Sequence, residues 1–238
     1  MLLSKLSHDQ MEPSLRPSGI IFDFDGVLVD SLPAHLQAWA DAVSEIFNRS
    51  VTDLSDLSGH SSRTIAHILA KRYGDPSLAN ILVKTKERLL ASGAIEVPLY
   101  PGVKSTIEFL AVADLPFAIG SNSLRPFVMA TTARVGLHVP VIVTASDVSR
   151  HKPAPDIFWE CSNGLRIDPK QRQNIIVFDD SIHGIKAAVA AGMTPIGISS
   201  STKPESLFAA GAVAVTESVA EAFALGWMQQ MPRKVQII

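Results

Sequence analysis

The chain has 238 residues, of which 47% are hydrophobic, so it is long enough to bury one large core and to carry an inserted smaller domain. Its formal net charge is −2 and the charges are spread along the chain, which argues against a nucleic-acid-binding surface and a membrane-surface helix. The single cysteine, Cys161, excludes an intrachain disulfide, and its apolar neighbours predict a buried thiol in a reducing compartment.

Residues 1–18 are predicted to be a flexible tail, within which Met11 is an alternative start of translation. The tail lacks the long apolar segment of a signal peptide. Nowhere does an apolar run approach the roughly 18 residues that a membrane span needs. We therefore expect a cytoplasmic protein, a monomer or weak homodimer, with neither a membrane nor a nucleic acid as its partner.

The apolar stretch 19–25 is predicted to be the first strand, and a segment without strands follows it. Residues 32–98 contain three helical patterns and no convincing strand. These predicted helices cover residues 33–47, 61–72 and 77–91. We interpret 32–98 as a small helical cap inserted after the first strand, and prolines near residue 100 mark the loop where the chain leaves it.

Strand-like and helical segments alternate along the rest of the chain. The predicted strands are 115–121, 140–146, 174–180, 194–199 and 212–216, and the predicted helices are 103–113, 125–135, 155–164, 182–191 and 204–210. Most of the strands are continuously apolar, as expected for parallel strands covered on both faces. The fold class predicted is therefore α/β, a doubly wound and mostly parallel sheet whose core comprises residues 19–31 and 99–238.

Two of the predicted strands end in pairs of carboxylates, Asp23 with Asp25 and Asp179 with Asp180. Residues two apart in a strand point to the same side, so Asp23 and Asp25 do so if the first strand reaches that far. The carboxyl ends of parallel strands share one edge, where open α/β sheets bind ligands. The alternative is that each aspartate caps a helix or loop independently. Two acidic strand ends favour a shared site for a hard cation, Mg²⁺.

Three further residues suit a phosphate group beside such an ion. Ser121 and Asn122 end another strand, where a hydroxyl and backbone N–H groups can hold phosphoryl oxygens, although Ser and Asn also cap helices. Lys152 precedes two prolines that stiffen its loop, whereas a lone lysine is usually a solvated surface residue. An aspartate is a competent nucleophile toward phosphorus, and a neighbouring carboxylate can act as general acid and base.

Four segments in this order resemble the motifs of the haloacid dehalogenase (HAD) superfamily of hydrolases. The resemblance covers nearly the whole chain after the tail. The segments are DFDGVLVDS (23–31), SNS (121–123), KPAPD (152–156) and DDSIHG (179–184). With a helical insert directly after the first motif, the chain resembles the subfamily with a C1-type cap, which includes beta-phosphoglucomutases and many small-metabolite phosphatases.

The resemblance implies roles for the catalytic residues. Asp23 would be the nucleophile, Asp25 the general acid and base, and Lys152 the cation that stabilises the charged intermediate. Ser121 would bind phosphate, helped by Asn122. Because dehalogenases and phosphonatases of the superfamily lack an acid two residues after the nucleophile, the second aspartate points to phosphate esters.

The resemblance also implies how Mg²⁺ would be held. Its ligands would be Asp23, the backbone carbonyl of Asp25, and Asp180, with Asp179 bound directly or through water. Gly26 would allow the turn after Asp25 and a close approach of the backbone to the phosphate.

The cap residues separate two candidate activities. Beta-phosphoglucomutases carry His and Trp at the spacing of His35 and Trp39, which share a helix face here. An ordinary amphipathic helix, with His at its edge and Trp in the core, explains the pair equally well. Arg63, in the loop 58–64, is a candidate contact for a second anionic group of the substrate.

We predict a Mg²⁺-dependent phosphatase for a small phosphorylated metabolite, with a phosphosugar mutase as the alternative. Mutases of the family usually carry a lysine a few residues into the second motif, where this chain has Leu124, and Arg125 is one position off. A mutase must hold both phosphates of a bisphosphate, so the loss of that cation matters. A non-catalytic protein that binds phosphorylated metabolites is less favoured, because all four motif segments are intact.

Overall fold

Six parallel strands form one sheet at the centre of the molecule, in the order β3-β2-β1-β4-β5-β6. A computed structural model describes residues 17–57 and 61–224. The strands are β1 (Gly19–Phe22), β2 (Phe117–Gly120), β3 (Val141–Val143), β4 (Ile175–Asp179), β5 (Thr194–Ile198) and β6 (Ala214–Thr216). The predicted α/β class with a parallel sheet is confirmed.

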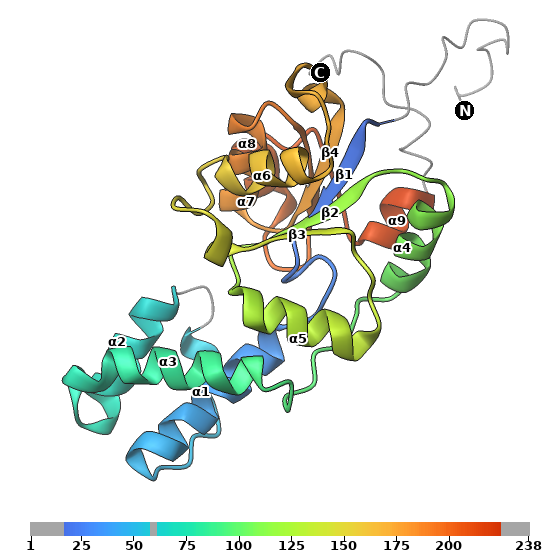
Figure 1. The fold of residues 1–238 in the computed structure, drawn as a ribbon. Helices are drawn as coiled ribbons and strands as arrows, with labels where there is room; N and C mark the ends of the chain where they lie inside the picture. The colour runs from blue at the N-terminus through green and yellow to red at the C-terminus, as the bar shows by residue number, and fades with distance from the viewer. Residues whose placement is uncertain (1–16, 58–60, 225–238) are drawn as a thin grey trace, which may run out of the picture.

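Helices cover both faces of this sheet and form a separate layer beyond its edge (Figure 1). The α-helices are α1 (Leu32–Phe47), α2 (Ser62–Tyr73), α3 (Ala79–Ala91), α4 (Val103–Val112), α5 (Arg125–Val135), α6 (Asp156–Gly164), α7 (Ile182–Ala190), α8 (Pro204–Ala210) and α9 (Val219–Ala224). Short 3₁₀ helices are η2 (Ser55–Leu57), η3 (Pro76–Leu78), η4 (Ala145–Asp147) and η5 (Pro169–Asn174). Among the described residues, no helix combines the length and apolar character needed to cross a bilayer.

The central strands are buried on both faces because their side chains alternate between two apolar clusters. Ile20 and Phe22 of β1 pack with α4, α5 and α9, and the Phe22 ring stacks on Phe178 of β4 at 5.4 Å. Ile21, between them, faces the opposite cluster with α6 and α7. This two-sided burial explains why the strands read as continuous apolar runs, and it fixes their ends at one edge.

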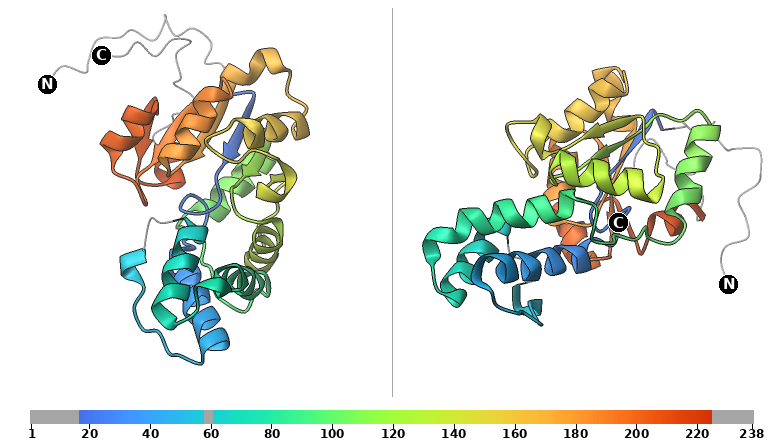
Figure 2. Two further views of the ribbon diagram at one scale, coloured as in Figure 1. Left: turned by 90° about the vertical axis from the view of Figure 1, so that its left-hand side faces the viewer. Right: turned by 60° about the horizontal axis from the view of Figure 1, so that its bottom comes forward.

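Helices α1, α2 and α3 have an apolar core of their own, which contains the buried Trp39, Leu69 and Leu82. They lie beside one another away from the sheet in all the views of Figures 1 and 2. The chain enters and leaves this layer through two segments that touch, since Val29 pairs with Leu99 in an antiparallel bridge. This arrangement supports the division into a cap (32–98) and a core (19–31 and 99–238), which we retain as a proposal.

The first strand is shorter than predicted, and this changes the site. It ends at Phe22 rather than at residue 25, because the amides of Leu28 and Val29 both turn back to the carbonyl of Phe24. Gly26 in this turn has a positive φ of 74°, which an L side chain rarely adopts. The condition for Asp23 and Asp25 to point to the same side, a strand that reaches residue 25, is therefore not met.

Two other differences lie at the ends of the chain. Helix α9 was not predicted, because its six residues are too few to show a helical period. At the other end, the predicted tail reaches Ser18, but the amide of Ser18 already bonds the carbonyl of Asn174 at 3.0 Å. Residues 1–16, with Met11, lie outside the described residues.

Candidate active site

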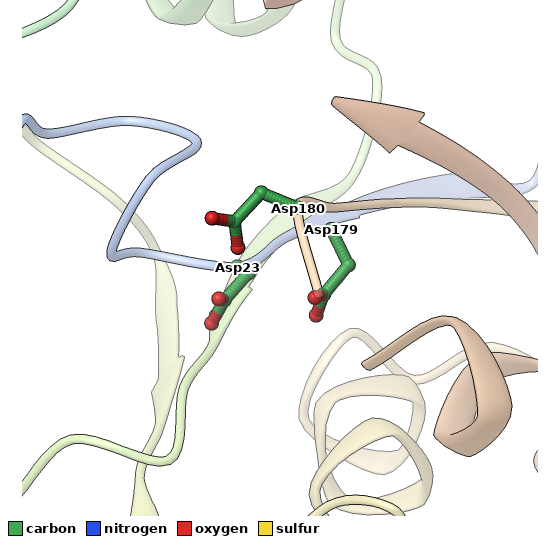
Figure 3. Close-up of side chains that lie close together, drawn as sticks. All are labelled: Asp23, Asp179 and Asp180. Atoms are coloured by element: carbon green, nitrogen blue, oxygen red, sulfur yellow. The ribbon is translucent and has the colours of Figure 1, made fainter. Parts of the chain in front are cut away.

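Three carboxylates meet where the sheet reverses its strand order. Strand β1 is flanked by β2 and β4, so the chain winds outward in both directions from the β1–β4 pair, and ligands of open α/β sheets bind at such a point. Asp23 follows β1, while Asp179 and Asp180 stand at the end of β4. Each offers one oxygen within a set whose members all lie within 4.8 Å of one another (Figure 3). The predicted convergence of acids at this edge is therefore present.

Lys152 supplies the positive charge in this cluster. Its Nζ donates to Asp23 Oδ1 at 2.8 Å and to Asp179 Oδ2 at 2.7 Å. The residue is only 7% exposed, and the ammonium also lies 4.8 Å from the centre of the Phe158 ring. The surface alternative for this lysine is excluded by its burial.

The charges of this cluster shift the pKa values of its members. Burial raises the pKa of Asp23 well above its ordinary value, and the neighbouring carboxylates add to this, while Lys152 partly offsets it. Burial and the charge of Asp179 raise the pKa of Asp180 to about 6. Burial alone would lower the pKa of Lys152. The charges of Asp179 and Asp23 outweigh burial and raise this pKa above its ordinary value, so the ammonium stays charged. A divalent cation would relieve the remaining repulsion.

Two glycines allow the carboxylates to pack against the backbone. A Cβ on Gly26 would lie 2.1 Å from Oδ2 of Asp180, and a Cβ on Gly184 would lie 1.8 Å from the carboxylate of Asp179. Ser181 completes the second contact, because its amide and its hydroxyl both donate to Asp179 Oδ1. Both oxygens of Asp179 are thus already hydrogen-bonded, one to Lys152 and the other to Ser181.

Asp25 does not join this cluster with its side chain. After the turn that ends β1, its carboxylate accepts from Ser31 Oγ at 2.5 Å and from Ser123 Oγ at 2.5 Å. Nε2 of His35 lies 3.4 Å from Oδ1, and the hydroxyl of Ser121 lies 3.5 Å from Oδ2. Burial raises the pKa of Asp25, but His35 and the serine donors outweigh burial and lower it to about 2. Asp25 is therefore ionised at neutral pH in this arrangement.

The loop after β2 connects the two carboxylate sites. Ser121 is buried and its hydroxyl accepts from the amide of Ser123. The side chain of Asn122 binds the main chain of Lys152 on both sides, accepting from its amide at 3.0 Å and donating to its carbonyl at 3.4 Å. Asn122 thus orients the loop that carries the lysine.

A cavity of about 860 Å³ opens between this edge of the sheet and the helices α2, α3 and α5. His35 and Arg63, both singled out from the sequence, line it together with Asn122 and Ser123. Residues 58–60, at the start of the loop 58–64 that carries Arg63, lie outside the described residues.

Lys86, which was not predicted as a site residue, lines the same cavity. It is 6% exposed, lies 5.6 Å from the centre of the Trp39 ring, and has its pKa lowered by burial. Its neighbours in sequence, Lys84 and Arg88, also line the cavity. In the sequence alone, three basic residues this close together are typical of a solvated charged helix face. Only the packing of α3 on α1 distinguishes Lys86 from them.

His35 and Trp39 have different surroundings despite sharing a helix face. His35 contacts Asp25 and lines the cavity, and its ring lies 5.3 Å from that of Phe127. Trp39 is buried in the core of the helical layer. His35 therefore lies at the site, as the mutase-like interpretation expects of it, whereas Trp39 lies in the core, as the ordinary amphipathic helix expects.

Arg125 is held away from the cavity. It donates to both carboxylate oxygens of Asp147, at 3.1 and 3.0 Å, and to the carbonyl of Ile142. The cavity is lined at this point by Leu124, which carries no charge. The second motif therefore offers no arginine or lysine to a bound ligand.

This combination of a doubly wound sheet, an acidic edge and a buried lysine defines a hydrolase. Residues 20–198 match the model of the haloacid dehalogenase-like hydrolases, and the chain belongs to that family.

Curated relatives include phosphatases of small phosphorylated compounds. The chain is 30% identical over 190 residues to the fructose-1-phosphate phosphatase of Escherichia coli strain K12, covering 77% of this chain and 97% of the relative. It is 30% identical over 186 residues to hexitol phosphatase A of the same organism, covering 77% and 84%. Among solved structures, one described as a beta-phosphoglucomutase from Thermotoga maritima aligns with a TM-score of 0.71 and 25% identity, covering 88% and 98%.

Replacing the buried lysine tests the electrostatics of the site. We expect Lys152→Met to lower the free energy of unfolding in metal-free buffer by about 3–5 kcal/mol, because it leaves two buried carboxylates without their counter-charge. The difference in free energy of unfolding between wild type and Lys152→Met should become smaller toward acidic pH. Asp23, whose pKa is already raised, then takes up a proton and no longer needs a counter-charge. Urea denaturation at several pH values measures this. Lys104→Met on α4, an exposed position, is the control, and equal losses in both variants would contradict the prediction.

Proposed function

We propose that the protein is a Mg²⁺-dependent phosphatase that hydrolyses a small sugar or polyol phosphate through an aspartyl-phosphate intermediate. The observation that carries the proposal is the buried cluster of Asp23, Asp179, Asp180 and Lys152, in which the lysine ammonium bonds one oxygen of Asp23 and one of Asp179. We retain the predictions that the enzyme works in the cytoplasm on a free metabolite, as a monomer or weak homodimer.

The donor set fits a small hard cation, because it consists of carboxylate oxygens at one buried edge. Asp23 and Asp180 are the proposed side-chain ligands, with the main-chain carbonyl of Asp25. Asp179 would act through water, since its oxygens already accept from Lys152 and Ser181. When bound, Mg²⁺ would neutralise charge on the nucleophile and the phosphate.

Asp23 is the proposed nucleophile. Its carboxylate attacks phosphorus in line, forming the Asp23–phosphate bond while the bond to the leaving alcohol breaks. Lys152 keeps its proton and offsets the charge of Asp23 and of the phosphoryl group. Ser121 and the amides that follow it are the proposed phosphate contacts, and Gly26 allows the backbone to approach.

Asp25 is the proposed general acid and base. It would protonate the leaving oxygen and later accept a proton from the water that hydrolyses the aspartyl-phosphate. Because it is ionised and bonded to Ser31 and Ser123 here, it must leave these donors and gain a proton before the first step. Closure of the helical layer over a bound substrate would exclude water and permit this change.

The cavity and the curated relatives support a polyhydroxylated substrate. Its walls carry His35, Arg63 and Lys86, whose polar groups can bind the hydroxyl or anionic groups of a sugar phosphate. The named relatives act on fructose 1-phosphate and hexitol phosphates, which are compounds of that kind.

The mutase alternative is favoured by His35 beside Asp25 and by the Thermotoga maritima structure. A mutase must also hold the second phosphate of a bisphosphate. Arg125 is engaged with Asp147, and Leu124 faces the cavity instead of a lysine, so we prefer the phosphatase.

Removing the proposed nucleophile should abolish turnover. We expect Asp23→Asn to lower the release of phosphate from p-nitrophenyl phosphate by at least about 1,000-fold, because the attacking carboxylate oxygen is lost. EDTA should stop the wild-type reaction and added Mg²⁺ should restore it. Asp53→Asn, at an exposed position in the helical layer, is the control that should keep full activity.

Retained activity in Asp23→Asn would exclude the nucleophile role. An absence of turnover in the wild type, across sugar phosphates, polyol phosphates and phosphoglycolate, would instead favour a binding protein.

The mutase alternative has a direct assay. Incubation with beta-glucose 1-phosphate and its bisphosphate primer should yield free phosphate and no glucose 6-phosphate, since the second motif lacks a free cation for the second phosphate. Both products are measured in the same reaction by coupled assays. Accumulation of glucose 6-phosphate would overturn the preference for a phosphatase.

Lys86 should contribute to substrate binding. We expect Lys86→Met to raise KM for the best sugar phosphate by about tenfold or more, because a hydrogen bond to a charged group is lost. The value for p-nitrophenyl phosphate, which has no hydroxyl groups to bind, should change less. Lys71→Met, exposed on α2, is the control, and an unchanged KM in Lys86→Met would remove the residue from the substrate site.

A further inference from the structure

Three consecutive serines follow β5 and link its loop to three parts of the core. The amide and the hydroxyl of Ser199 both donate to the carbonyl of Thr216, at the end of β6. The hydroxyl of Ser200 donates to the carbonyl of Gly26 at 2.5 Å, and its oxygen lies 3.4 Å from Oδ2 of Asp180. The hydroxyl of Ser201 donates to the main-chain carbonyl of Asp180 at 3.2 Å.

The same carboxylate oxygen of Asp180 is approached by both Gly26 and Ser200. The backbone of Gly26 comes so close that a Cβ there would fall 2.1 Å from Oδ2. The hydroxyl of Ser200, which is itself bonded to Gly26, lies 3.4 Å from Oδ2. Both groups therefore limit the space that this oxygen can occupy.

The same hydroxyl joins loops that follow three different strands. Gly26 belongs to the turn after β1, Asp180 follows β4, and Ser200 lies after β5. Because Gly26 adopts a positive φ in the turn that carries both Asp23 and Asp25, a bond to its carbonyl also holds that turn in place. Ser200 is exposed, so no packing requirement of the core explains its position.

We propose that Ser200 is a positioning residue for the magnesium site, which holds the Asp180 carboxylate and, through the Gly26 carbonyl, the turn that carries Asp23 and Asp25. This inference rests on the proposed function, since it assumes that the ion binds Asp23 and Asp180. Ser200 touches neither the substrate nor the reacting atoms. It acts through Asp180 and through the turn after β1.

The test measures Mg²⁺ binding to the full chain in the absence of substrate, by calorimetric titration. We expect Ser200→Ala to weaken Mg²⁺ affinity by about tenfold or more, as is usual when a partner of a metal ligand is removed. Ser200→Thr keeps the hydroxyl at an exposed position and should retain the wild-type affinity. Ser199→Ala is the matched control, because Ser199 bonds the end of β6 and makes no contact with Asp180.

A second readout is the rise of the thermal midpoint on adding Mg²⁺, which should be smaller for Ser200→Ala than for wild type while the metal-free midpoints stay equal. Wild-type affinity in Ser200→Ala, or an equal loss in Ser199→Ala, would overturn the proposal. Asp180→Ala separates this from a failure of the proposed function. If Asp180→Ala binds Mg²⁺ as well as wild type, the metal site itself is misplaced and both proposals fail.

Discussion

The whole site depends on one electrostatic constraint, the gathering of carboxylates at the buried edge between β1 and β4. Buried charges are unfavourable unless each has a partner, so the chain must provide positive charge at the same place. Lys152 does this for Asp23 and Asp179 with two short hydrogen bonds from one ammonium. Burial and the charge of Asp179 raise the pKa of the Asp180 carboxyl to about 6, which Lys152 offsets only in part. The arrangement is therefore prepared for a further cation.

Neighbouring loops maintain this arrangement through main-chain contacts. Asn122 binds both the amide and the carbonyl of Lys152, so the loop after β2 orients the lysine. Ser181, the residue before α7, donates to Asp179 within the end of β4. Ser200 links Gly26 to Asp180. The contacts of Asn122 and Ser200 thus join the ends of different strands, whereas that of Ser181 stays at the end of β4.

The proposed function places the chemistry and the contacts to the substrate in different parts of the molecule. The acidic cluster and Lys152 lie at the sheet, whereas Lys86 and Arg63 belong to the helical layer. His35 connects the two, because it stands in α1 and contacts Asp25. Under this proposal, changes in the inserted helices can alter the substrate without altering the acidic cluster.

The sequence by itself determined the fold class, the convergence of Asp23, Asp179 and Asp180, and the family, because apolar runs and strand-end residues are local patterns that a parallel sheet brings to one edge. Tertiary structure alone decided where Asp25 points, since the strand ends before it and a turn redirects its carboxylate to Ser31 and Ser123. Lys86 and Ser200 also emerged only in the folded chain. In the sequence, Lys86 resembles the exposed lysine and arginine near it on α3, and Ser200 resembles the serines on either side of it. Only contacts with residues distant in sequence distinguish them, and no local pattern encodes such contacts.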